Sequence, residues 1–208
     1  MSSLFSKLFH FVILTSSKYS IDESHSLKHS MEVLQFAHKI YEREVTKNVL
    51  LETQERIIYT AAIVHDMCDK KYMNEKKAIR ELGDLLEPDL SDLEVTIVKE
   101  IVSTMSYSKV KANGFPHLGP YLGAYHVVRE ADLLAAYDFD RCMIYQMHAT
   151  DADIYAAFDN ANELFENRVF KHNDHGLFLT DYAKEASLGL HEQAIQRIGS
   201  WRRVLRVN

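Results

Sequence analysis

The sequence predicts an all-helical fold, and three observations lead to this prediction. The chain of 208 residues has only 7 Gly and 3 Pro, too few for the many turns of an all-β sandwich. Apolar residues recur at helical spacing along most of the chain, without the alternation of a half-buried strand. Hydrophobic residues make up 47% and charged residues 26%, as in ordinary globular proteins. We therefore expect a single domain over 1–208 with one sizeable core.

Local signals in the sequence place the ends of several helices. Ser91 and Glu94 form a capping-box pattern that begins one helix, and Pro88 ends the helical region before it. Pro120 suits the first turn of another helix, and 107–119 is expected to be the longest loop. The expected helices span about 4–15, 27–45, 54–67, 75–86, 91–105, 120–137, 139–149, 154–167 and 181–207.

Charge, cysteines and hydropathy restrict the class of protein. The net charge of −6 argues against binding to a nucleic-acid polymer, but it allows a local basic pocket for one small phosphate ester. Cys68 and Cys142 form no Cys-x-x-Cys pair, so we expect a reduced, cytoplasmic chain. The apolar run at 8–14 is too short to span a bilayer. It is expected to lie in a buried first helix, with no association with a membrane.

Three helices each place a polar side chain on an apolar face. His29 shares its face with Val33, and His65 shares its face with Ile58. Asp132 likewise lies on the apolar stripe of its own helix, where a carboxylate is costly unless something pairs with it. Each residue alone also fits a satisfied core position, and Asp132 alone also fits an ion pair within its helix. Together they indicate a site at which three helices converge.

The residue types at this site suit a divalent metal ion. Asp66 directly follows His65, and neighbouring residues about 100° apart on a helix can both reach one ion. With His29 and Asp132 they would supply two imidazoles and two carboxylates, a set that suits Mn, Mg, Fe, Co, Ni or Zn. A water bound to such an ion has a lowered pKa and can attack phosphorus.

The order His, then His-Asp, then Asp resembles the signature of the HD superfamily of metal-dependent phosphohydrolases. Its flanking sequences are also similar to that family, and the resemblance covers about residues 20–140. Residues 141–208 are then expected to form a C-terminal helical extension. The segments that carry the resemblance are SHSLKHSMEV at 24–33, AAIVHDMCDKK at 61–71 and VVREADLLAAYD at 127–138.

This resemblance implies a helical bundle around one buried divalent metal ion. It implies that the protein hydrolyses a small phosphate ester, foremost a nucleotide, and that Asp66 belongs to the catalytic machinery. Related small HD proteins often carry Asp after their Ser-His pair and Arg three residues after the first ligand, where this chain has Ser26 and Glu32. These differences bear on substrate preference. The ligands implied by the resemblance are His29, His65, Asp66 and Asp132.

Several nearby residues are candidates for catalysis or for binding phosphate. Asp69 lies one turn past Asp66 and suits a general acid or base, or else a turn aspartate. Lys70 and Lys71 would stabilise phosphate charge if they lie near the metal, and are otherwise solvated. Arg129 suits a bidentate phosphate clamp or a structural salt bridge.

Two further candidates for contact with the substrate lie elsewhere in the sequence. His25, one turn before His29, is expected to contact the substrate or supply a proton. Lys109 belongs to the expected loop, which is either a lid over the substrate or a plain surface connection.

Two other functions remain open from the sequence alone. A two-iron HD-type oxygenase would need more His ligands between Asp66 and Asp132, and only His117 and His126 are available. A non-catalytic module that binds a metal or a nucleotide would keep the same ligands. The aromatic-rich C-terminal part, which includes Tyr155, suits either the core or the surface of a homodimer.

Overall fold

The structure is a computed structural model that describes residues 1–207, and it confirms the all-helical prediction. Within these residues every regular element is a helix. Short 3-10 helices, among them η1 (Glu23–His25) and η4 (Val169–Lys171), join some of the α-helices. The α-helices are α1 (Ser2–Tyr19), α2 (Leu27–Glu44), α3 (Glu55–Val64), α4 (Glu75–Leu86), α5 (Asp92–Thr104), α6 (Tyr107–Asn113), α7 (Leu122–Ala135), α8 (Phe139–Thr150), α9 (Ile154–Asn167) and α10 (Asp181–Leu205).

Several helices begin where a side chain accepts hydrogen bonds from their free backbone amides. Ser91 and Glu94 form the expected capping box at the start of α5. Asp138 caps α8 by accepting a hydrogen bond from the backbone amide of Arg141 at 3.1 Å. This cap holds the first turn of α8, and with it Arg141, in place.

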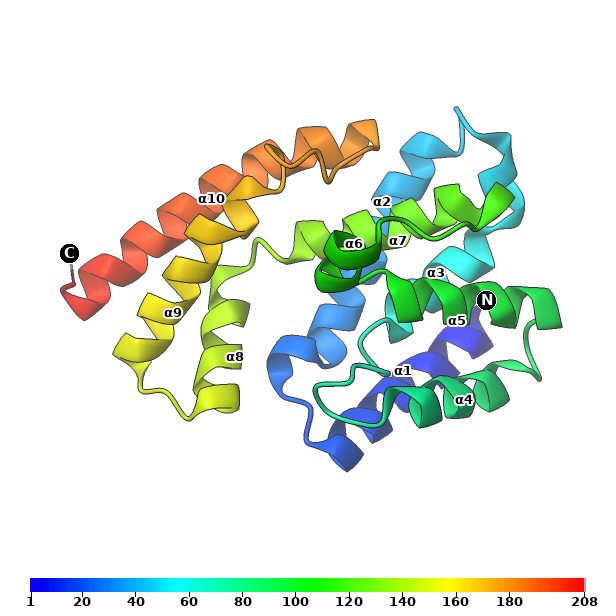
Figure 1. The fold of residues 1–208 in the computed structure, drawn as a ribbon, viewed down its shortest axis with the longest axis horizontal. Helices are drawn as coiled ribbons and strands as arrows, with labels where there is room; N and C mark the ends of the chain where they lie inside the picture. Colours follow the sequence, from blue (N-terminus) through cyan, green and yellow to red (C-terminus); the bar gives the residue numbers. More distant parts are fainter. Residues whose placement is uncertain (208) are drawn as a thin grey trace.

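Helices α2, α3 and α7 form the centre of the fold. Helix α2 packs against both α3 and α7, and α3 also packs against α5, α7 and α1. Helices α8, α9 and α10 lie together to one side of this bundle, at the left in Figure 1. The long helix α10 reaches back from that side to contact α2 and α7.

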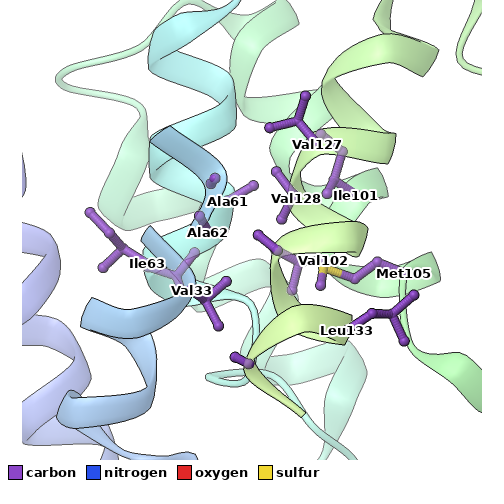
Figure 2. Close-up of a cluster of buried hydrophobic side chains, with 14 of the residues drawn as sticks. Val33, Ala61, Ala62, Ile63, Ile101, Val102, Met105, Val127, Val128 and Leu133 are labelled. Carbon is purple, nitrogen blue, oxygen red and sulfur yellow. The ribbon is translucent and has the colours of Figure 1, made fainter. Parts of the chain in front are cut away.

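The core fills the space between these helices with aliphatic side chains. Val33 of α2, Ala62 of α3, Ile101 of α5 and Val128 of α7 are fully buried, and Figure 2 shows them in one cluster. Small side chains such as that of Ala62 let neighbouring helices approach closely. Each fully buried aliphatic side chain of Val or Ile size stabilises the fold by roughly 1.5–3 kcal/mol.

Two expectations about the helices need correction. Residues 107–113 form α6 rather than part of a loop, because the Gly and Pro residues of 107–119 all follow Asn113, and Gly114, at a φ of 74°, ends the helix. The first helix extends to Tyr19, beyond its expected end. Its Leu8 and Val12 are fully buried, which confirms the expectation of a buried first helix. Within the described residues, no helix combines the length and apolar character that a membrane crossing requires.

One histidine is buried without any hydrogen bond to its ring. His172, next to η4, has no exposed surface, and neither ring nitrogen has a partner among the described residues. Aromatic rings of Tyr107, Tyr137 and Phe178 surround it. Burial, reinforced by the positive charge of Arg168, lowers the pKa of His172 to about 3.

We therefore predict that His172 makes the fold less stable in acid. An unfolded histidine titrates near pH 6.5, so between that pH and about 3 the unfolded chain binds a proton that the folded chain excludes. Stability should fall as the pH drops through this window, by up to about 1.4 kcal/mol per pH unit from this residue. His172→Phe should reduce the pH dependence of the free energy of unfolding, measured with urea from pH 7 to 5. The exposed-site variant His10→Phe should keep it, and an unchanged slope in His172→Phe would contradict the prediction.

Candidate functional site

Three central helices bring the four predicted ligands together. His29 lies in the first turn of α2, which begins at Leu27, and Asp132 lies in α7. His65 and Asp66 follow the last residue of α3 in a turn, rather than within the helix as expected. Because α2, α3 and α7 pack against one another, their polar side chains meet in one place.

The meeting point is the Nε2 atom of His29. It lies 3.1 Å from Nε2 of His65, 3.3 Å from Oδ1 of Asp132 and 3.5 Å from Oδ2 of Asp66. His29 and His65 are 2% and 6% exposed, so water scarcely reaches them. Ligand atoms of His29, His65 and Asp66 all lie within 4.8 Å of one another, and this group could hold a metal ion.

The polar atoms of this cluster fit a cation. Oδ2 of Asp66 is buried without a hydrogen bond of good geometry, and Nε2 of His65 and Nε2 of His29 lie 3.2 Å and 3.5 Å from it, so one oxygen and two nitrogens converge as around a cation. The Nδ1 atom of His65 lies 2.9 Å from the carbonyl oxygen of Ala62. When Nδ1 is protonated it donates a hydrogen bond to that carbonyl, and Nε2 keeps a free lone pair. Histidines that bind a metal are usually arranged in this way.

Within the cluster, the imidazoles and the carboxylates shift one another's pKa values. Burial acts to raise the pKa of Asp66, but His65 and the other nearby imidazoles outweigh it and hold that pKa well below its usual value. The pKa of Asp132 is likewise lowered, against burial, by a hydrogen bond from His29 and by the charge of His65. Burial lowers the pKa of His29 to about 4, whereas the two carboxylates outweigh burial and raise the pKa of His65 to about 9. Without an ion, His65 therefore carries a second proton, on Nε2, which a bound metal ion would replace.

A pocket of about 350 Å³ opens beside Asp66 and Asp132, which form part of its wall. Its other walls come from η1, from the turn after α3, from α8, from the end of α9 and from Ser106 and Tyr107 at the start of α6. Three basic side chains line it, from Lys71, Arg141 and Arg168. The pocket is therefore a place where an anion can lie next to the candidate metal ligands.

The sequence did not predict the two arginines of this pocket. Nη1 of Arg141 lies 2.7 Å from Nε2 of His29 and donates to the carbonyl oxygen of Ser24 at 3.1 Å. The guanidinium of Arg168 lies over the ring of Tyr107, 4.1 Å from its centroid. Arg141 and Arg168 belong to the expected C-terminal extension, and no local pattern separates them from surface arginines. Only the packing of α8 and α9 brings them to the site.

Three of the other predicted residues line the same pocket. His25, Asp69 and Lys71 do so, and the ammonium of Lys71 lies 5.3 Å from the centroid of the Tyr145 ring. Burial is the largest influence on His25 and lowers its pKa, so its ring is neutral near pH 7. Lys70 is exposed and lies outside the pocket lining.

The structure places Arg129 and Lys109 away from the pocket. Arg129 is 2% exposed, pairs with Glu130 at 3.0 Å and donates to the carbonyl oxygen of Leu177 at 2.6 Å. Its guanidinium is thus bound inside the fold. Of the two roles expected for Arg129, the structure shows the salt bridge and not the phosphate clamp. Lys109 pairs with Glu75 and lines a separate pocket, because α6 turns its side chain toward α4.

The remaining acidic and histidine candidates also lie apart from this pocket. Glu32 lines a second pocket of about 350 Å³ together with Asp138 and Arg141, and it is absent from the lining of the pocket beside Asp66. His126 packs against Phe115, with ring centroids 4.8 Å apart, and burial lowers its pKa to about 4. Among the described residues, neither His126 nor His117 joins the group of possible metal ligands.

We predict that Arg129 and Arg141 have different effects on stability. Arg129→Met leaves the fully buried Glu130 without its ion-pair partner and should lower the free energy of unfolding by about 3–5 kcal/mol. Arg141→Met removes a half-buried cation at the pocket and should change it by less than about 1 kcal/mol. Urea unfolding of both variants measures the difference. Equal stability of the two would show that Arg129 is not a structural residue.

Comparison with known proteins identifies relatives in fold but not in sequence. No family model matches the sequence, and no curated protein matches it. A Lactobacillus plantarum protein solved by structural genomics is 18% identical, with a TM-score of 0.70 over 99% of this chain and 98% of that one. Bacillus subtilis YpgQ, solved in complex with ADP, is 22% identical, with a TM-score of 0.66 over 95% of this chain and 96% of that one. The chain therefore shares its whole fold, α8–α10 included, with these two proteins.

Proposed function

We propose that this protein is a metal-dependent phosphohydrolase of the HD superfamily and that its substrate is a nucleotide. One observation carries the proposal: a buried cluster of two imidazoles and two carboxylates forms one side of a pocket lined by Lys71, Arg141 and Arg168. A cation site and an anion site thus lie side by side. Hydrolysis of a phosphate ester needs both, because it needs an activated water and a held phosphoryl group.

In this proposal His29, His65, Asp66 and Asp132 hold one divalent cation. The bound ion would supply an activated water and a Lewis acid for the phosphoryl oxygen. The carbonyl of Ala62 orients His65, and the basic side chains of the pocket bind and orient the phosphate. The low exposure of His29 and His65 keeps bulk water from the ligands.

The nucleotide is supported by the pocket and by one structural neighbour. YpgQ was solved with ADP, which carries two phosphate groups. In this chain, the pocket offers three cations for phosphates and the rings of Tyr107 and Tyr145 for a base or a sugar.

In this proposal Asp69 positions Lys71. Its Oδ1 accepts a hydrogen bond from the backbone amide of Lys71 at 2.9 Å, and its Oδ2 lies 3.6 Å from Nζ of Lys71. These contacts favour positioning of Lys71 over the general acid or base role expected from the sequence.

The test is a panel of nucleotides and phosphomonoesters assayed with Mn²⁺, Mg²⁺, Co²⁺, Ni²⁺, Fe²⁺ and Zn²⁺. We expect turnover that chelation abolishes and that added metal restores. His65→Ala and Asp66→Ala should each lower kcat by more than about a hundredfold, because even residues that only support metal ligands contribute about 10- to 100-fold. His38→Ala, at an exposed histidine of the same helix as His29, should retain activity.

Two results would contradict this function. Metal-bound protein that turns over nothing in the panel would favour a non-catalytic binding module. Two irons per chain by metal analysis would favour the oxygenase, although within residues 1–207 no further histidine joins the candidate ligands.

A separate prediction concerns the phosphate contacts. Arg141→Gln and Arg168→Gln should each raise the Kd for ADP about 10- to 100-fold, because each removes a charged hydrogen-bond donor worth about 1.5–3 kcal/mol. Isothermal titration calorimetry in the presence of Mn²⁺ measures this. Arg197→Gln is the matched control, since Arg197 pairs with Asp140 outside the pocket. Unchanged affinity in both pocket variants would remove the anion site from the proposal.

A further inference from the structure

A hydrogen-bond network behind the pocket is centred on a buried carboxylate. The side chain of Asp22 is 3% exposed and caps η1 by accepting a hydrogen bond from the backbone amide of Ser24 at 2.9 Å. The hydroxyl of Tyr72 donates to its Oδ2, also at 2.9 Å. Neither Asp22 nor Tyr72 lines the pocket, whereas the neighbouring His25 does.

The carboxylate determines where the hydroxyl hydrogen of Tyr72 points. Burial acts to raise the pKa of Asp22, but hydrogen bonds from the Ser24 side chain, the Tyr72 hydroxyl and the Ser24 amide outweigh it and lower that pKa. Asp22 is therefore an anion at neutral pH and can only accept hydrogen bonds. The hydroxyl of Tyr72 has a single hydrogen, which it directs to Asp22.

The same hydroxyl oxygens contact one ring nitrogen of His25. Its Nδ1 lies 2.6 Å from Oγ of Ser24 and 3.2 Å from Oη of Tyr72. Because the hydrogen of Tyr72 points to Asp22, the Tyr72 oxygen presents only lone pairs to Nδ1. A bare Nδ1 would set its own lone pair against that oxygen, 4.0 Å from the negative Oδ2 of Asp22. A proton on Nδ1 is instead accepted by the oxygens of Tyr72 and Ser24. The proton of the neutral ring therefore lies on Nδ1, and Nε2 is left with a free lone pair.

His25 is also close to the candidate metal ligands. Its ring meets the ring of His29 edge to face, with centroids 6.2 Å apart, and it lines the pocket together with Asp66. Among the described residues, no hydrogen bond reaches its Nε2. Asp69, the other candidate to handle a water, is already engaged with Lys71.

We propose that Asp22, acting through Tyr72, holds His25 in the tautomer protonated at Nδ1, so that Nε2 accepts a hydrogen bond from the attacking water and orients it. Asp22 and Tyr72 are then positioning residues, and His25 touches the reacting water. The role of the water rests on the proposed function, whereas the tautomer does not depend on it. Orientation of a reactant in this way contributes to the rate without adding to the binding of substrate.

The tautomer is tested by nitrogen-15 NMR of the histidine rings in metal-free protein. We expect wild-type His25, assigned by its loss in His25→Asn, to show a protonated Nδ1 and an unprotonated Nε2. In Asp22→Asn the amide NH₂ can donate to Tyr72, which frees the hydroxyl hydrogen of Tyr72 to turn toward Nδ1. That variant should therefore shift His25 toward the tautomer protonated at Nε2, while Asn keeps the cap of η1. A wild-type ring protonated at Nε2 would overturn the proposal.

Kinetics test what the network does for the reaction. Asp22→Asn and Tyr72→Phe should each lower kcat about tenfold and leave KM within about twofold, because they disturb orientation and not binding. His25→Asn should lower kcat at least as far, and adding Tyr72→Phe to it should have no further effect. Tyr59→Phe is the matched control, since its hydroxyl also contacts a histidine ring nitrogen, Nδ1 of His38 at 2.7 Å, away from the pocket.

The outcomes separate this inference from the proposed function. Suppose that His65→Ala abolishes activity but Tyr72→Phe and Asp22→Asn keep the wild-type kcat. That result would overturn the role of the network and leave the proposed hydrolase function intact. A wild-type chain with the expected tautomer but no turnover with any metal would refute the hydrolase and the role of the water together, and would support the tautomer alone.

Discussion

The structure depends on the electrostatic compensation of four polar side chains inside an apolar core. Carboxylates and imidazoles from α2, α3 and α7 meet around Nε2 of His29, where little water can solvate them. The two carboxylates stay ionised because His65 is protonated, and its Nε2 lies 3.2 Å from Oδ2 of Asp66 and 3.7 Å from Oδ1 of Asp132. A divalent cation would compensate this charge better than one shared proton, which is why metal binding is central to the proposed function.

The C-terminal helices complete the site. Arg141 of α8 and Arg168, next to the end of α9, bring positive charge to a chain whose net charge is −6. The two proteins of similar fold are matched over nearly the whole chain, so this part belongs to the shared architecture. A local concentration of cations beside an acidic metal cluster suits one small phosphorylated ligand and does not suit a long polyanion.

Hydrogen bonds behind the site give its side chains defined orientations. The carbonyl of Ala62 orients His65, and the network centred on Asp22 orients His25. In both rings these contacts engage Nδ1, so Nε2 is left for the metal ion or the water of the proposed reaction. Sites whose donors and acceptors are held in advance lose less free energy to reorganisation during the reaction.

The sequence by itself determined the helical class, most helix boundaries and the inward direction of His29, His65 and Asp132, because these follow from local periodicity and capping. It misassigned 107–113, where a short helix lacks a strong starting signal, and left Arg129 undecided between phosphate clamp and salt bridge. Only the tertiary structure decided that Arg129 is engaged inside the fold and that Arg141 and Arg168 line the pocket. Those contacts join residues far apart in the sequence, and their geometry is set by how helices pack, which no local pattern encodes.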